Sequence, residues 1–206
     1  MNPHTWALFL GAVFLLSGTP GPNMLHVMTR SLRFGFGASL FAMAGCLSAV
    51  VLVLCASATG LGAVLAASPN LFAWLRYAGV AYLILLGVQA WRGAGGAVEV
   101  GVDPVAPSPA RLFRGGFLIG VSNPKLLLFA AAFLPQFIDP TVDQGLQLAI
   151  LVATFAAAEG FWYAAYALGG RHLARHLARP ALRRLFDRAT GAIFVGFGLG
   201  LLAGRP

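Results

Sequence analysis

Long apolar stretches separated by short polar segments make up most of this 206-residue chain. Most of these stretches reach about 20 residues, the length that an α-helix needs to cross the hydrocarbon core of a membrane. The pattern therefore predicts an all-α membrane protein with six transmembrane helices. The expected spans are Thr5–Thr29, Gly37–Gly62, Leu71–Trp91, Gly115–Phe137, Leu146–Leu168 and Thr190–Ala203.

The first and the fourth predicted spans are each interrupted halfway by residues that break helices. The first break is Gly18-Thr19-Pro20-Gly21-Pro22-Asn23, and the second is Ser122-Asn123-Pro124-Lys125. Lipid offers the backbone no hydrogen bonds, so non-helical backbone at this depth survives only inside protein or beside a watery cavity. Breaks at corresponding positions of the two halves predict a substrate site near the bilayer midplane.

Three spans in each half mean that the two halves enter the membrane from opposite sides, as in an inverted repeat. We expect residues 1–92 to form the first three-helix repeat and residues 114–206 to form the second. Residues 93–113 are expected to be a cytoplasmic linker, because most of this stretch is rich in Gly, Pro and Val, which is typical of flexible chain.

Charged residues make up only 10% of the chain, and the arginines behind its net charge of +8 cluster at the ends of the apolar stretches. This distribution fits anionic lipid headgroups and argues against nucleic acid as a partner. Loops after odd-numbered spans are basic and the other loops are not, which predicts that both termini face outward from a bacterial inner membrane. The segment Arg171–Arg188 is interpreted as an interfacial amphipathic helix, broken at Pro180, that contacts headgroups.

The first break offers groups for both ends of a zwitterion. Pro20 and Pro22 lack N–H groups, which leaves the carbonyls of Leu16 and Gly18 free to face a cation. A second half-helix is expected from Asn23 onward, capped by the Asn23 side chain, with a positive end that suits a carboxylate. The alternative is a proline kink that only shapes the helix. Two Pro, two Gly and one Asn within six residues favour a site.

The second break repeats this logic and adds a charge. Pro124 frees the carbonyl of Gly120, and Asn123 can cap the helix that follows. Lys125 is the only lysine of the chain, and at this depth a lysine costs about 3 kcal/mol or more unless it is paired or hydrated. We interpret it as a ligand for a substrate carboxylate; the alternative is a lysine that snorkels to the cytoplasmic face. The predicted substrate-binding residues are Pro20, Gly21, Pro22, Asn23, Asn123, Pro124 and Lys125.

Two titratable residues are candidates for proton coupling. Glu159 lies near the middle of the fifth span, where a carboxylate could carry a proton or pair statically with Lys125. His26 is the second candidate, with a packing histidine as the alternative. His172 and His176 have the i, i+4 spacing that permits a shared metal, but no third ligand accompanies them and headgroup contact is favoured. We expect no metal and no cofactor.

Small and aromatic residues in the spans are interpreted mainly as packing elements. Gly116 and Gly120 form a GxxxG motif, which indicates general helix packing more than a dedicated dimer face, although glycine-rich faces permit a homodimer. Trp162 and Tyr163 are interpreted as interface-belt or packing residues, and Trp162 could also line a cavity.

Three motifs in order along the chain resemble those of a known family. Thr19–Asn23 resembles the TPGPN signature of the LysE/RhtB amino-acid exporters. Asn123–Lys125 followed by Phe133–Phe137 is similar to that family's NPK…FLPQF block, and the stretch 75–83 is similar to its third span. The resemblance covers nearly the whole chain.

The resemblance implies a bacterial inner-membrane protein that exports an amino acid such as lysine, homoserine, threonine or leucine, driven by the proton gradient. It marks the predicted substrate-binding residues as signature positions, whereas Glu159 and His26 match no motif. The leading interpretation is thus a secondary exporter of an amino acid or close derivative. The alternatives are a transporter of another solute such as a metal cation, or a membrane-embedded enzyme. Both need clusters of acids, His or Cys, which the chain holds only scattered.

Overall fold

The computed structural model describes residues 2–67, 107–139 and 142–177, together with single positions between 74 and 92 and between 184 and 199. Every regular element in the three continuous ranges is helical, which confirms the all-α prediction for this part of the chain. The third and sixth predicted spans, most of the linker, and Pro180 lie largely or wholly outside the described residues.

The first half of the chain begins with two short helices and a long one. Helix α1 runs over Pro3–Gly18, α2 over Pro22–Phe34 and α3 over Phe36–Ala67. The axes of α1 and α2 bend by 52° at the intervening break, and the pair has the length and composition of one membrane span. Within α3, Phe36–Ala58 is long and apolar enough to cross a membrane by itself.

The described part of the second half holds short helical segments and a long helix. Helix α5 runs over Pro109–Val121, so it begins before the predicted end of the linker, and α6 runs over Pro124–Leu128. A π-helix, η1 (Phe129–Phe133), and a 3₁₀-helix, η2 (Leu134–Phe137), follow directly. The Ser57 hydroxyl of α3 donates to the carbonyl of Ala130 at 2.7 Å and supports this irregular backbone.

The last described helix, α7, runs over Gln144–Leu177, and its portion Gln144–Gly170 is apolar and long enough to cross a membrane. We expected Arg171–Arg188 to form an amphipathic helix broken at Pro180. Residues Arg171–Leu177 are helical, as the continuation of α7, and the rest of this segment lies largely outside the described residues. The two glycines before Arg171 do not interrupt the helix, since a helix in protein surroundings tolerates glycine at a modest cost.

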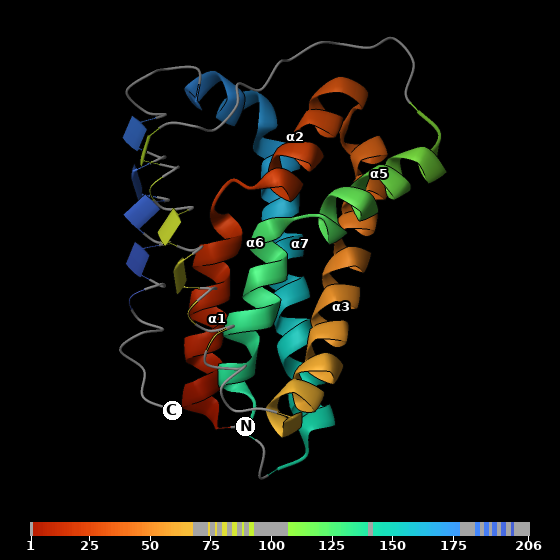
Figure 1. Ribbon diagram of the computed structural model, residues 1–206. Coiled ribbons are helices and arrows are strands. Elements are labelled where there is room, and N and C mark those ends of the chain that lie inside the picture. The colour runs from red at the N-terminus through yellow and green to blue at the C-terminus, as the bar shows by residue number, and fades with distance from the viewer. Residues whose placement is uncertain are drawn as a thin grey trace.

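The helices lie so that the two breaks come together. In Figure 1, α3 and α7 run along the length of the molecule, α1 and α6 lie in the half that holds the N-terminal end, and α2 and α5 lie in the other half. The junctions α1–α2 and α5–α6 therefore occur at a similar height.

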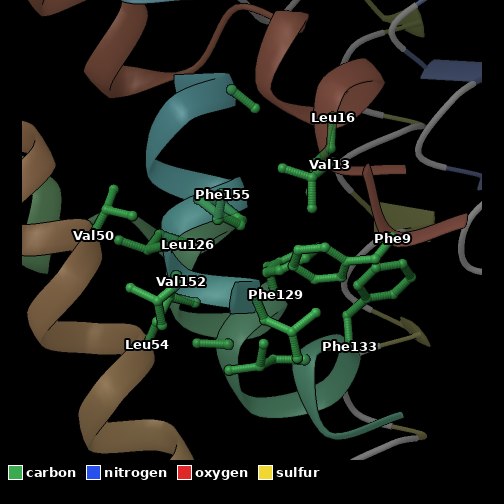
Figure 2. Close-up of a cluster of buried hydrophobic side chains, with 14 of the residues drawn as sticks. Phe9, Val13, Leu16, Val50, Leu54, Leu126, Phe129, Phe133, Val152 and Phe155 are labelled. Atoms are coloured by element: carbon green, nitrogen blue, oxygen red, sulfur yellow. The ribbon is translucent and has the colours of Figure 1, made fainter. Parts of the chain in front are cut away.

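Two apolar clusters fill the interior, one in each half of the molecule. The phenylalanine cluster joins α1, α3, α7 and the α6–η2 segment, and its rings pack at centroid distances such as 4.8 Å between Phe129 and Phe155 (Figure 2). The methionine cluster joins α2, α3 and α7 around Met24, Met28 and Tyr163. Burying these side chains is the main favourable contribution to helix packing inside the protein.

Helices α3 and α5 are in backbone contact. A Cβ atom added at Gly45 would collide with the carbonyl oxygen of Phe113, and one added at Gly116 would collide with that of Ala42. A Cβ at Gly120 would collide with the Ala49 side chain. The GxxxG motif of α5 thus packs against α3 of the same chain, which confirms its interpretation as a helix-packing motif.

Candidate functional site

A layer of buried polar side chains lies where the two breaks meet. Unpaired polar groups are costly inside a protein, so a buried layer of this kind needs hydrogen-bond partners or a function. It is made up of Ser17, Thr19, Asn23, Asn123, Lys125 and Glu159.

The first break is an extended connection between two helix ends. Helix α1 ends at Gly18, and its cap residue Thr19 folds back, donating from its N–H and its hydroxyl to the Leu16 carbonyl at 3.1 and 2.6 Å. Helix α2 begins at Pro22, one residue earlier than expected, with Gly21 as its N-cap. Proline favours the first helical position because its missing N–H would be unpaired there anyway.

Asn23 does not cap α2, contrary to the prediction, because it lies inside the first turn. No side chain caps this end of α2. The N–H groups of Asn23 and Met24 fall in the first turn, where the helix itself supplies no acceptor. The helix dipole places a partial positive charge there as well, so this end of α2 suits an anion.

The second break is closed by its own residues. The Asn123 side chain accepts a hydrogen bond from the Lys125 N–H at 3.0 Å and caps α6, which confirms the predicted cap. The Asn123 N–H donates to the Gly120 carbonyl at 3.1 Å, so the acceptor that we expected to be free is occupied. This turn needs no partner from another helix.

Lys125 links the second break to the first. Its Nζ donates to the carbonyls of Leu16 at 3.1 Å and Thr19 at 3.2 Å, and it lies 3.4 Å from the Thr19 hydroxyl. The side chain is only 9% exposed, so the snorkelling alternative is wrong. Glu159 is not among the hydrogen-bond partners that the described residues provide for Lys125, although the two charges attract each other. A static, direct pair is therefore not what holds the lysine.

Aromatic side chains of α7 occupy other carbonyls at the end of α1. The Tyr166 hydroxyl donates to the Gly18 carbonyl at 2.9 Å, and the Trp162 indole donates to the Phe14 carbonyl at 2.9 Å. We expected the carbonyls of Leu16 and Gly18 to face an ammonium group or cation; the Leu16 carbonyl does pair with the Lys125 ammonium, whereas the Gly18 carbonyl pairs with the neutral Tyr166 hydroxyl. Buried carbonyls are rarely left without a donor, and here the donors come from distant helices.

A second network connects Asn23 to Glu159. The Asn23 Nδ2 group donates to the Tyr163 hydroxyl at 3.0 Å, and the Glu159 carboxylate lies close enough to that hydroxyl to interact with it electrostatically. Asn23 Oδ1 is buried and has no partner among the described residues. Tyr163 is completely buried, so its interpretation as an interface-belt residue is wrong, whereas packing was the correct alternative. The open oxygen of Asn23 and the nearby carboxylate together suit a cation.

Tyr163, Tyr166 and the Thr19 hydroxyl are site residues that sequence reasoning missed. A signal was present, because Glu159, Trp162, Tyr163 and Tyr166 follow the spacing i, i+3, i+4, i+7. Residues at this spacing share one helix face. An acid on the same face as three hydrogen-bonding aromatics distinguishes that face from one that only meets lipid.

The remaining predicted candidates lie apart from these networks. His26, on α2, has a buried Nε2 without a partner in the described part of the chain, and it lies near Gly115 of α5. None of the contacts found for the described residues joins it to Glu159. The side chains of His172 and His176 lie outside the described residues. Within the described ranges, no three His, Cys, Asp or Glu residues gather as metal ligands would.

The family model for LysE type translocators matches residues 14–205, which is almost the entire chain. The chain is a member of the LysE family. A LysE type translocator moves solutes across a membrane, so the protein is a membrane transporter and not an enzyme. This confirms the resemblance that the three motifs indicated.

Curated members of the LysE family are similar over the full length. A homoserine/homoserine lactone efflux protein of Salmonella typhimurium is 32% identical, with 100% of this chain and 99% of the relative covered. A membrane protein of Vibrio cholerae without an assigned activity is 31% identical, with 100% of both chains covered. A leucine efflux protein of Salmonella choleraesuis is 27% identical, with 93% of this chain and 91% of the relative covered. No solved structure matches the chain at a significant level.

Proposed function

We propose that this LysE family member is a secondary transporter that exports an amino acid or close derivative across the bacterial inner membrane. One observation carries the assignment of the site: the uncapped end of α2 lies beside Lys125, within a layer that also holds Asn23 and Glu159. Positive and negative groups thus lie in one buried layer that includes Asn23. That is the arrangement that a zwitterion requires.

The substrate carboxylate is proposed to bind at the first turn of α2. The N–H groups of Asn23 and Met24 would donate to it, as helix N-termini do for anions. Lys125 adds positive charge at this place, because its Nζ would lie 3.3 Å from a Cβ built on Gly21, the N-cap residue of α2. Pro20 and Pro22 keep this turn open, since neither has an N–H that could close it.

The substrate ammonium is proposed to bind between Asn23 Oδ1 and Glu159. The oxygen of Asn23 is buried without a partner among the described residues, and Tyr163, which holds the Asn23 amide, also lies near the Glu159 carboxylate. An ammonium group would supply the missing donor to Asn23 and neutralise Glu159. Asn123 and Pro124 act indirectly, by setting the position of Lys125.

The site is closed in this structure, so transport needs the helices around it to separate. Asn23 and Glu159 are each 3% exposed and Lys125 is 9% exposed. Rocking of two inverted halves around the breaks would open the site to either side in turn. We also propose that Glu159 couples transport to protons, with His26 as a second titratable group. Both termini are proposed to face outward, and Arg171–Arg188 is proposed to contact lipid headgroups.

Counterflow in proteoliposomes tests the proposed function. Purified protein is reconstituted with unlabelled homoserine or leucine inside, and uptake of the labelled amino acid is followed. We expect uptake above that of empty liposomes for at least one amino acid. Asn23→Ala should abolish it, because the variant removes the open oxygen and the link to Tyr163. Ser48→Ala is the control, since Ser48 is exposed on α3 and bonds only within its own helix. Absence of counterflow for every amino acid, or normal counterflow by Asn23→Ala, would contradict the proposal.

A further inference from the structure

The carbonyl end of α1 is built like a site for a small monovalent cation. The oxygen atoms of the Leu16 carbonyl, the Thr19 carbonyl and the Thr19 hydroxyl converge on one point. The negative end of the α1 dipole lies at the same point and favours positive charge there. In this structure the ammonium group of Lys125 occupies the point, reaching it from a position more than a hundred residues later in the chain.

Lys125 has no donor left for a substrate in this state. An ammonium group has three N–H bonds, and three oxygen atoms of residues 16–19 surround Nζ at 3.1 to 3.4 Å. Nζ is also enclosed, because the side chain is 9% exposed. The lysine thus acts on a carboxylate at α2 through its charge alone, while its hydrogen bonds belong to α1.

We propose that Lys125 is a tethered cation that fills a monovalent-cation site at the end of α1 and thereby closes the two breaks upon each other. The chemical class of ligand that this site takes is a primary ammonium. In the native chain this ammonium group is that of Lys125 on α6, and the second break fixes its position. The Asn123 cap and Pro124 start α6 at the residue before the lysine, which orients its side chain toward α1.

Truncation of the lysine should therefore create a site for a free ammonium. Lys125→Ala keeps Cβ and removes three methylene groups together with the amine. The removed part has about the volume and the charge of n-propylammonium. We expect n-propylammonium to raise the unfolding temperature of Lys125→Ala in detergent and to leave that of the unchanged protein where it is. The alcohol n-propanol, which lacks the charge, and tetramethylammonium, which lacks N–H donors, should have no such effect.

Lys125→Met is the matched control for this experiment. Its side chain fills nearly the same volume without a charge, so no room remains for n-propylammonium and no stabilisation is expected. An unchanged unfolding temperature of Lys125→Ala in n-propylammonium would overturn the inference. Equal stabilisation of Lys125→Ala and Lys125→Met would also overturn it, because the amine would then act elsewhere.

A transport measurement keeps the inference testable even if Lys125→Ala does not fold. This second arm rests on the proposed function, and it compares homoserine with homoserine lactone, which lacks the carboxylate. A tethered cation at α1 is needed for the closed state whatever the substrate, so Lys125→Met should abolish counterflow of homoserine lactone as well as that of homoserine. Loss of homoserine counterflow alone would assign Lys125 to the substrate carboxylate and overturn the inference. Counterflow by the unchanged protein is read separately, so a failure of the proposed function is recognised as such.

Discussion

The two breaks look alike in sequence, yet their backbone hydrogen bonds go to different places. At the second break, Asn123 satisfies the start of α6 and its own N–H satisfies the Gly120 carbonyl. At the first break, the Leu16 carbonyl accepts from Thr19 of the same turn and also from Lys125 of α6, whereas the Thr19 and Gly18 carbonyls accept from Lys125 and from Tyr166 of α7. No side chain of the described residues caps the start of α2.

This difference indicates a division of roles between the breaks. A turn that satisfies itself keeps its shape whatever its neighbours do, so the second break is suited to carry a fixed group. A turn whose partners come from other helices can exchange those partners when the helices move. The first break is therefore where binding of a solute can be linked to a change of conformation.

Removal of the charge of Glu159 should have the largest effect. Glu159→Gln cannot release or take up a proton, so uptake driven by a pH gradient should be abolished. Counterflow, which needs no net proton movement, should persist in this variant at saturating substrate, with a weaker apparent affinity because the substrate ammonium loses the charge of one of its two proposed partners. The measurement is uptake with and without an imposed gradient in the same liposomes. If gradient-driven uptake by Glu159→Gln were normal, Glu159 would take no part in proton coupling and would have only a structural role.

Two tyrosines on one face of α7 offer a matched pair at the first break. Tyr163→Phe leaves the buried Asn23 side chain without its one hydrogen-bond partner among the described residues, which should cost about 3 kcal/mol of unfolding free energy. Tyr166→Phe removes the same atom, but it leaves only the Gly18 carbonyl unpaired and should cost about 1 kcal/mol. Unfolding curves of both variants measure this difference, and counterflow should fall further in Tyr163→Phe. Equal costs would mean that the Asn23–Tyr163 bond is dispensable.

Glycines within the first break differ in what surrounds them. A Cβ at Gly18 would lie 2.7 Å from the Trp162 ring, and that ring is fixed by its bond to the Phe14 carbonyl. Gly18→Ala should thus destabilise the protein by about 2 kcal/mol through overpacking. A Cβ at Gly21 would lie 3.3 Å from Lys125 Nζ, the end of a flexible side chain, so Gly21→Ala should cost less. A thermal shift assay ranks the two; the reverse order would show that Lys125 is held more rigidly than Trp162.

The smallest effect is expected at the second break. Asn123→Ala removes a helix cap and should cost about 1 kcal/mol, and Asn123→Ser should recover most of it. Chemical unfolding of the three proteins measures these differences. A loss several times larger than that of Tyr166→Phe would show that the second break, too, depends on distant helices, and the contrast between the breaks would fail.

Local features were predictable from the sequence, and partners across the chain were not. The Asn123 cap was predicted at the level of the residue, since capping involves atoms two or three positions apart. The partners of Lys125 were missed because they lie 109 and 106 residues away. The start of α2 at Pro22 follows a local rule, which is the preference of proline for the first helical position. We overlooked this rule because the next residue, Asn23, is of a type that often caps helices.

The aromatic residues of α7 show a second limit. An apolar helix with Trp and Tyr has the same sequence pattern whether those rings meet headgroups, lipid or a neighbouring helix. Tyr163 therefore could not be placed by composition, although its spacing from Glu159 carried information. The all-helical architecture needed no such detail, because the length and the apolar character of the stretches determined it.

The contact between α3 and α5 has a practical consequence for measuring motion. Peptide groups at Gly45 and Gly116 touch the opposite backbone, so these two helices have no side-chain layer through which to slide. Leu40 on α3 and Leu118 on α5 are exposed and can carry spectroscopic labels without entering the contact. Their separation would serve as an internal ruler of constant length, against which a displacement of a label on α1 or α2 could be read during turnover.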